Sequence, residues 1–289
     1  MNSMNIQKIT IIGLGLLGGS LALSLKKKRA PAKIVGTSRR ASTVRKALKR
    51  RIIDEGILDH KRAVMGSDLI FICTPINKII PTLKEISPLL KAGAIVTDIG
   101  STKEWIVREA DRIIPKKAFF VGGHPMAGTE ETGLDAAMPG LFEGKPYIIT
   151  PTPRTNKRAV STLEGIIKKL KVRVIKMSPE KQDILAAGIS HLPLAVAAAL
   201  VNTIASMKGK KDFAAVASSG FRDTTRVASG DPKLGTDIFF TNKDAVLMML
   251  SRFKRSLSKI EKDIKKGRPA DILRDLSLAK KFRDTVYPK

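Results

Sequence analysis

A glycine-rich turn near the N-terminus constrains the fold of this 289-residue chain more than any other feature. Residues 8–12 form an apolar run, glycines follow at positions 13, 15 and 18, and a helical pattern extends over residues 16–28. In such a strand–turn–helix unit, the three glycines permit a tight turn, backbone approach to a pyrophosphate and close packing of the helix. The helix N-terminus also offers free N–H groups to phosphates. We therefore expect a dinucleotide-binding site, and not a glycine-rich turn of another α/β fold. The residues expected along the cofactor here are Gly13, Gly15, Leu16, Leu17 and Gly18.

The end of the second predicted strand, residues 33–37, indicates which dinucleotide is bound. NAD-binding domains usually place Asp or Glu there, about 20 residues past the glycines, to hold the ribose 2′-OH. In this chain no Asp or Glu occurs before Asp54, and the strand is followed by Ser38, Arg39 and Arg40. Arginine binds phosphate through a planar fork of donors. The sequence therefore favours NADP, and the alternative is a pair of solvated arginines.

Composition limits the partners and the compartment. The single cysteine, Cys73, excludes a disulfide within the chain and favours a reducing, cytoplasmic location. A formal net charge of +27 favours contact with anions, including nucleic acid. However, Lys and Arg are spread over the whole chain, which has one Trp and two Tyr, so no platform for stacking bases is evident. We expect no nucleic-acid partner and no metal site.

A charge-free stretch over residues 184–207 is long enough to span a bilayer, which takes about 20 residues. It is rich in alanine and contains His191, Pro193 and Asn202. These polar and helix-breaking residues favour a central buried helix of a soluble protein. We therefore expect no membrane association.

The order of predicted elements divides the chain in two. Strands and helices alternate up to residue 177, which predicts a doubly wound, mostly parallel sheet in a dinucleotide-binding domain over residues 1–177. Ser178 and Pro179 then suit the N-cap and first position of a helix, and only helices are expected over residues 178–289. The expected strands are 8–12, 33–37, 68–74, 94–98, 119–125, 147–150 and 172–175, and the expected helices between them are 16–28, 41–51, 79–90, 102–114 and 157–170.

Two polar residues follow predicted strands at the edge where open α/β sheets bind ligands. His124 lies at the exit of the strand over residues 119–125, between glycines and a proline, and could take a proton from a substrate hydroxyl. Ser101 follows the strand over residues 94–98. Ser101 and Glu104 also match a capping box, so Ser101 could begin a helix, a role compatible with catalysis. We expect His124 and Ser101 in the active site.

The helical region contains further candidates. His191 lies in the charge-free helix, where Pro193 is expected to kink the backbone. A buried histidine needs a hydrogen-bonding partner. Residues 218–226 carry Arg222 and Arg226 after a run of small residues. An (i, i+3) surface pair of Asp223 with Arg226 is as plausible at this point as a carboxylate-binding site.

Taken together and in order, these motifs resemble the prephenate/arogenate dehydrogenase family over essentially the whole chain. The most specific of them are Gly-His-Pro-Met-Ala-Gly (residues 123–128), Ser-His-Leu-Pro (190–193) and Gly-Phe-Arg-Asp-Thr-Thr-Arg (220–226). Residues 38–39 and 218–220 look most like the NADP-using, arogenate-preferring members from photosynthetic lineages. The resemblance implies an N-terminal Rossmann domain, a helical domain that forms an intertwined homodimer, and a role in tyrosine biosynthesis.

The resemblance also implies roles for individual residues. His124 would accept the hydroxyl proton with Ser101 hydrogen-bonded beside it, and His191 and Arg226 would bind the substrate. Other substrate-binding positions would be Thr129, Glu130 and Arg222, and other cofactor-binding positions Ser38, Arg39, Arg40, Thr74 and Pro75. The chain departs from many members by lacking Trp after the Asp-Pro pair in residues 231–235, which removes the expectation of an aromatic wall there. No regulatory domain is expected after the helices.

The implied reaction is the NADP-dependent oxidative decarboxylation of arogenate, prephenate or both, giving tyrosine or 4-hydroxyphenylpyruvate. The sequence leaves the choice of substrate open, because the two differ only by a side-chain amine or ketone. One other class is an NADP-dependent reductase acting on a small hydroxy acid or imine, which commonly uses a lysine in the helical domain. The other is a non-catalytic NADP- or nucleic-acid-binding protein, which only the charge favours.

Overall fold

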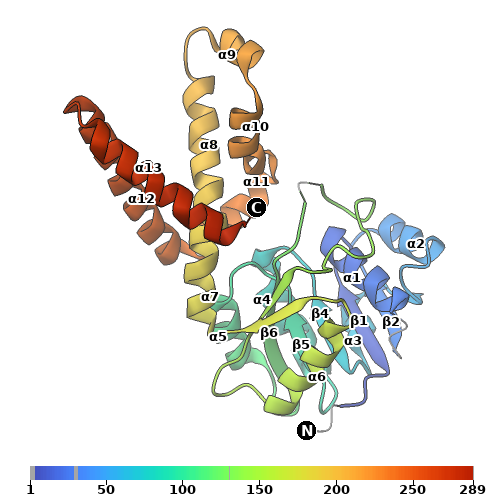
Figure 1. The fold of residues 1–289 in the computed structure, drawn as a ribbon. Coiled ribbons are helices and arrows are strands. Elements are labelled where there is room, and N and C mark those ends of the chain that lie inside the picture. Colours follow the sequence, from blue (N-terminus) through green and yellow to red (C-terminus); the bar gives the residue numbers. More distant parts are fainter. Residues whose placement is uncertain (1–3, 29–31, 130, 289) are drawn as a thin grey trace. The chain divides into compact units, whose positions relative to one another are not determined.

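A single twisted sheet forms the centre of the N-terminal part of the chain (Figure 1). The computed structural model describes residues 4–28, 32–129 and 131–288. The strand order is β3-β2-β1-β4-β5-β6-β7-β8, and every neighbouring pair is parallel except β6 and β7. This confirms the predicted doubly wound, mostly parallel sheet. The strands are β1 (Lys8–Ile12), β2 (Lys33–Thr37), β3 (Glu55–Gly56), β4 (Leu69–Ile72), β5 (Ile95–Asp98), β6 (Phe119–Pro125), β7 (Pro146–Thr150) and β8 (Arg173–Lys176).

Helices cover both faces of the sheet, which explains why β4 and β5 are buried along their whole length. One apolar cluster joins one face to α1 (Leu16–Lys27), α2 (Ala41–Lys49) and α6 (Lys157–Lys168). A second cluster joins the other face to α3 (His60–Val64), α4 (Ile76–Ile86) and α5 (Glu104–Ile113), with the short 3₁₀ turn η1 (Ser87–Leu89) after α4. The carboxyl ends of β1, β4, β5 and β6 therefore meet at one edge between two helical layers.

The sequence predicted most of these elements, with small differences at their ends. β2 and β6 have the predicted bounds. β3 and α3 were not predicted, since two and five residues are too short for a periodic pattern. Helix α5 begins at Glu104, two residues later than predicted.

The helical region begins where Ser178 accepts a hydrogen bond from the Lys181 N–H, as its N-cap role predicted. No strand occurs after β8 in the part of the chain that the structure describes, which confirms a helical C-terminal region. Its first elements are α7 (Pro179–Ala186), the π-helical turn η2 (Ala187–His191), α8 (Leu192–Ala205), α9 (Lys210–Val216), α10 (Ser219–Thr225), the 3₁₀ turn η3 (Arg226–Ser229) and α11 (Pro232–Thr241). The chain divides into compact units at Lys243, so the predicted domain boundary near residue 177 stays a prediction.

The second compact unit, Asp244–Lys289, is built from α12 (Lys243–Lys265) and α13 (Pro269–Val286). Lys259 on α12 forms ion pairs with Asp263 on the same helix and with Asp275 on α13. This shared ammonium joins the two helices of the unit.

The prediction of a buried central helix over residues 184–207 is wrong for the single chain. The continuous helix over residues 179–205 is long and apolar enough to cross a membrane, by length and composition alone, and 22% of its most apolar window is buried. Ile189 is 68% exposed and Ile184 is 45% exposed. The physical reason is that the neighbouring short helices cover only part of this apolar surface.

Candidate active site

The glycine turn between β1 and α1 has the shape that the fingerprint predicted. Gly13 has φ of +102°, and a Cβ atom there would lie 2.5 Å from the Cys73 carbonyl oxygen. A Cβ atom on Gly18 would lie 2.0 Å from the Gly13 carbonyl oxygen. By contrast, a Cβ atom on Gly15 would meet nothing within 4 Å. Gly13 and Gly18 therefore let the backbone close, and Gly15 leaves open space at the helix N-terminus, where a pyrophosphate would fit.

The side chains of Leu16 and Leu17 pack into the apolar core. Only their backbone N–H groups in the first turn of α1 could therefore contact a cofactor. No acidic residue occupies that first turn, and Gly15 gives no side-chain cap. The helix N-terminus is thus available to an anion.

The residues expected to select NADP follow β2 beside this turn. The Gly13 N–H donates to the Thr37 carbonyl at 2.9 Å, which joins the turn to the end of β2. Ser38 Oγ accepts from the Arg40 N–H at 3.3 Å, and the side chains of Arg39 and Arg40 are exposed. Asp54 instead accepts from the Ile34 N–H at 2.8 Å, near the start of β2. The first carboxylate of the sequence therefore lies at the opposite end of the strand.

Thr74 and Pro75 follow β4, the strand that pairs with β1 on its other side. Pro75 is the N-cap residue of α4. The Thr74 hydroxyl is buried and has no hydrogen-bonding partner among the described residues. This hydroxyl is free to bind a cofactor that lies across the glycine turn.

His124 lies at the end of β6, after two glycines. The close packing at Gly122 and Gly123 leaves no room for a side chain at either position. A Cβ atom on Gly122 would lie 2.3 Å from Thr150 Oγ1, and one on Gly123 would lie 2.8 Å from the Tyr147 hydroxyl. The antiparallel partner strand β7 also pairs Ile148 with His124. The imidazole is buried, with 7% of the residue exposed.

A buried ion pair holds this end of the sheet together. The Asp98 carboxylate, at the end of β5, accepts from the Gly100 N–H at 2.8 Å, from the Gly123 N–H at 3.2 Å and from Lys103 Nζ. The side chains of Asp98 and Lys103 are both completely buried. Because the Gly123 amide precedes His124, the pair fixes the backbone from which the imidazole projects.

The predicted capping box of Ser101 with Glu104 is wrong. Helix α5 begins later because Asp183 on α7 caps it from outside: its carboxylate accepts from the Lys103 N–H at 2.7 Å and from the Glu104 N–H at 2.9 Å. A carboxylate at a helix N-terminus is stabilised by both hydrogen bonds and the helix dipole. The Ser101 hydroxyl is consequently not used as a cap, and it is buried without a partner in the described part of the chain.

Gln182, the neighbour of Asp183, connects α7 to the catalytic candidates. Its side-chain amide donates to the Ser101 carbonyl at 3.2 Å. Gln182 is completely buried and lies near the His124 side chain, whose pKa it influences. The structure thus brings together Ser101, His124 and Gln182 at one edge of the sheet.

Burial keeps both histidines of the site neutral. Desolvation, followed by the nearby Lys103 and His191, lowers the pKa of His124 to about 3, while Gln182, acting as an acceptor, opposes this shift. Desolvation lowers the pKa of His191 to about 4. The electrostatic effect of His191 on His124 also places His191, on η2, in the surroundings of His124. A neutral imidazole can accept a proton, as a general base must.

Several buried polar atoms on the segments at this edge of the sheet have no hydrogen-bonding partner among the residues described. Buried polar groups are normally paired, so such a group of unpaired atoms indicates a ligand or water site. They lie on segments that follow β4 and β5, on β6, on α7 and on η2, and they fit a polar substrate beside a nicotinamide cofactor. These atoms are Thr74 Oγ1, Ser101 Oγ, His124 Nδ1, Gln182 Oε1 and His191 Nε2, and the hydroxyls of Tyr147 and Thr150 on β7 are unpaired as well.

The structure does not place all predicted substrate-binding residues at this site. Thr129 is exposed in the loop after β6, where its hydroxyl accepts from the Glu131 N–H at 3.3 Å. Glu130 lies outside the described residues. Arg222 is exposed and pairs with Asp223 at 3.0 Å. Arg226 begins η3, which packs beside α8, the helix that follows His191.

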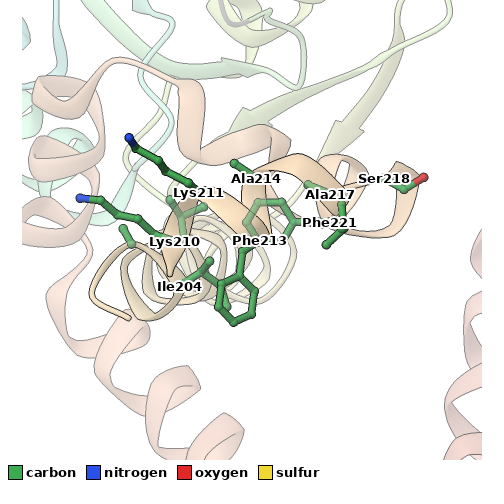
Figure 2. A pocket seen from close by; sticks show the side chains of 11 residues that line it. Ile204, Lys210, Lys211, Phe213, Ala214, Ala217, Ser218 and Phe221 are labelled. Atoms are coloured by element: carbon green, nitrogen blue, oxygen red, sulfur yellow. The ribbon is translucent and has the colours of Figure 1, made fainter. Parts of the chain in front are cut away.

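An apolar cavity of about 560 Å³ lies elsewhere, between α8, α9 and the start of α10 (Figure 2). Its lining includes Ile204, Phe213 and Phe221, while the side chains of Lys210 and Lys211 extend away from the two rings. Ser218, which the sequence placed next to the substrate motif, lines this cavity. Val201, Ile204 and Ala205 of α8 also line this cavity, and His124 does not.

Sequence reasoning missed five residues of the site. Asp98 and Lys103 lie on either side of Ser101 in the sequence, and their spacing across a strand exit was an available signal. Gln182 and Asp183 follow the N-cap of α7, but nothing local shows that they reach Ser101 and α5. For Asn242, which contacts His191, the sequence gives no local signal. The missed residues are Asp98, Lys103, Gln182, Asp183 and Asn242.

The chain is similar to known dehydrogenases over nearly its whole length. Residues 21–176 match the family model described as "Prephenate dehydrogenase, nucleotide-binding domain", and residues 178–278 match "Prephenate dehydrogenase, dimerization domain". The chain is 36% identical to a prephenate dehydrogenase of Bacillus subtilis, with 97% of this chain and 77% of that protein aligned.

Two solved structures share the fold. A Synechocystis arogenate dehydrogenase has a TM-score of 0.84 and 37% identity, with 97% of this chain and 100% of that chain covered. A prephenate dehydrogenase from A. aeolicus, in complex with hydroxyphenyl propionate and NAD+, has a TM-score of 0.92 and 34% identity, with 99% and 100% covered.

Proposed function

The chain belongs to the prephenate dehydrogenase family, and on this basis we propose that it catalyses the NADP-dependent oxidative decarboxylation of arogenate, prephenate or both. The observation that carries the proposal is the buried, neutral imidazole of His124 beside the unpaired Ser101 hydroxyl, at the sheet edge that also carries the glycine turn. Formation of reduced cofactor and CO2 from either substrate tests it.

In the proposed reaction, His124 takes the proton of the substrate ring hydroxyl while a hydride leaves the ring carbon that bears this hydroxyl. When bound, a nicotinamide cofactor would supply the hydride acceptor. The resulting ring ketone is conjugated to the carbon that bears the carboxylate, so the bond to that carboxylate breaks and CO2 leaves. The bonding electrons enter the ring, the ketone oxygen takes up a proton, and the aromatic ring that forms makes the reaction strongly downhill.

NADP preference is proposed because Ser38, Arg39 and Arg40 follow β2 beside the glycine turn, and Asp54 lies at the other end of that strand. Arg39→Ala should raise KM for NADP about 10- to 150-fold, since a charged hydrogen bond contributes about 1.5–3 kcal/mol. The KM for NAD should change little. Steady-state kinetics with each cofactor measures the difference.

The matched control is Arg45→Ala, which removes an exposed arginine from α2. It should leave the NADP-to-NAD ratio unchanged. If Arg39→Ala weakens both cofactors equally, or neither, Arg39 does not contact a 2′-phosphate.

Arg226 is proposed to bind a carboxylate of the substrate, because the substrate is an acid and η3 packs beside the helix that follows His191. Arg226→Ala should raise KM for the substrate about 10- to 150-fold with unchanged NADP affinity. Arg252→Ala on α12 provides a control of the same type. A lower melting temperature with an unchanged KM would assign Arg226 a structural role instead.

The exposed apolar surface of the helical region is proposed to pair with a second copy of this chain. The matched dimerisation-domain model covers residues 178–278, within which Ile189 is 68% exposed and Phe240 is 74% exposed. Exposed apolar patches of this kind usually mark an interaction surface. A sedimentation mass of one chain, 31.4 kDa, at micromolar concentration would refute the homodimer.

A further inference from the structure

Asn242, at the end of α11, makes two hydrogen-bonding contacts through one atom. Its side-chain nitrogen lies 2.8 Å from the Asp183 carbonyl oxygen and 3.1 Å from His191 Nδ1. Asn242 is 6% exposed and His191 is 1% exposed. The contact therefore lies in the buried interior, where each donor needs an acceptor.

The first contact fixes the orientation of the amide. A backbone carbonyl only accepts hydrogen bonds, so the Asn242 atom beside Asp183 must be the NH₂ group. The reversed amide would place two acceptor oxygens against each other. The same NH₂ group has a second hydrogen, and that hydrogen points to His191.

The second contact fixes the tautomer of His191. An amide nitrogen only donates, so His191 Nδ1 must accept and cannot carry a proton. A neutral imidazole carries one proton, which must then be on Nε2. His191 Nε2 is buried and has no partner among the described residues. His191 thus presents an unused donor at the site.

We propose that Asn242 is a positioning residue that holds His191 in its Nε2–H tautomer, so that His191 donates a hydrogen bond to an oxygen atom of the substrate. This rests on the proposed function, because it assigns a role in binding the oxygen-rich substrate. It also separates the two histidines of the site: His124 accepts a proton, and His191 offers one hydrogen bond and keeps its proton. The lowered pKa of His191, which results from burial, keeps it neutral in this role.

The test is ¹⁵N NMR of the imidazole nitrogens in the full-length protein, which contains three histidines. In the wild type, we expect the Nδ1 signal of His191 at the unprotonated position and Nε2 at the protonated one. A proton on Nδ1 of wild-type His191 would overturn the proposal without any variant. His191→Gln identifies the signals.

Asn242→Asp provides the matching perturbation. A carboxylate accepts from His191, so the proton should move to Nδ1, and KM for the substrate should rise about tenfold with a smaller change in kcat. Asn202→Asp, an exposed position on α8, is the control and should change neither the tautomer nor KM. An unchanged KM after the tautomer has switched would overturn the proposal.

The NMR readout requires no turnover. If the wild-type tautomer is as expected and Asn242→Asp switches it, but no arogenate or prephenate is oxidised by the wild type, the proposed function fails. Substrate binding to His191 is then refuted too, while the Asn242–His191 contact remains established.

Discussion

His124→Asn should lower kcat by about 10²- to 10⁴-fold, the usual contribution of a positioned general base. Asparagine keeps a polar side chain in the buried site, but it cannot take the hydroxyl proton. Binding of NADP and of the substrate should persist, because the glycine turn and the proposed carboxylate contact are unaffected. Single-turnover measurements at saturating substrate, with separate binding titrations, distinguish lost chemistry from lost binding.

His60→Asn is the matched control. His60 is partly exposed on α3 and pairs with Glu85 at 2.6 Å, so its replacement should leave kcat unchanged. A His124→Asn variant with near-normal kcat would exclude His124 from the chemical step.

The pH profile gives a second readout for His124. Because its pKa is lowered to about 3, the imidazole is protonated only well below the ordinary value of about 6.5. Protonation removes the base, so kcat/KM should fall on the acid side only far below that ordinary value.

Lys103→Met should destabilise the protein by about 3–5 kcal/mol, the cost of removing one partner of a buried ion pair. The Asp98 carboxylate would remain in a completely buried site with two backbone N–H groups and no cation. The free energy of unfolding, measured by denaturant titration, should show the loss. The double variant Asp98→Asn/Lys103→Met removes both charges, and it should recover a large part of that stability.

Lys46→Met is the comparison for an exposed pair. Lys46 contacts Asp135 at 2.8 Å, but both side chains are largely solvated, so the loss should be about 0–1 kcal/mol. If Lys103→Met costs no more than Lys46→Met, the buried pair does not hold the end of the sheet.

The sequence was sufficient for the parts of the fold that follow from local patterns. The apolar runs with intervening helical patterns predicted the parallel sheet, and Gly13 and Gly18 have the backbone roles that the fingerprint assigns to them. His124 was located because a strand exit in an open sheet is a place where ligands bind. The neighbours of Ser101 and His124 in space agree with this assignment, and the catalytic role stays a prediction.

The remaining features depend on contacts between residues far apart in the sequence. The capping box at Ser101 was a sound local pattern, but Asp183, about 80 positions away, provides the cap for α5. Asn242 reaches His191 across 51 positions. The exposure of α8 could not be predicted either, because an apolar helix gives the same pattern whether its own chain or a second copy covers it.

The most direct test of this account is the steady-state rate of cofactor reduction by the purified wild-type protein, measured with arogenate and with prephenate, each with NADP and with NAD. We predict turnover and CO2 release with at least one of the two substrates, and a higher kcat/KM with NADP than with NAD. No reduction of either cofactor with either substrate, by folded protein that binds NADP, would contradict the account.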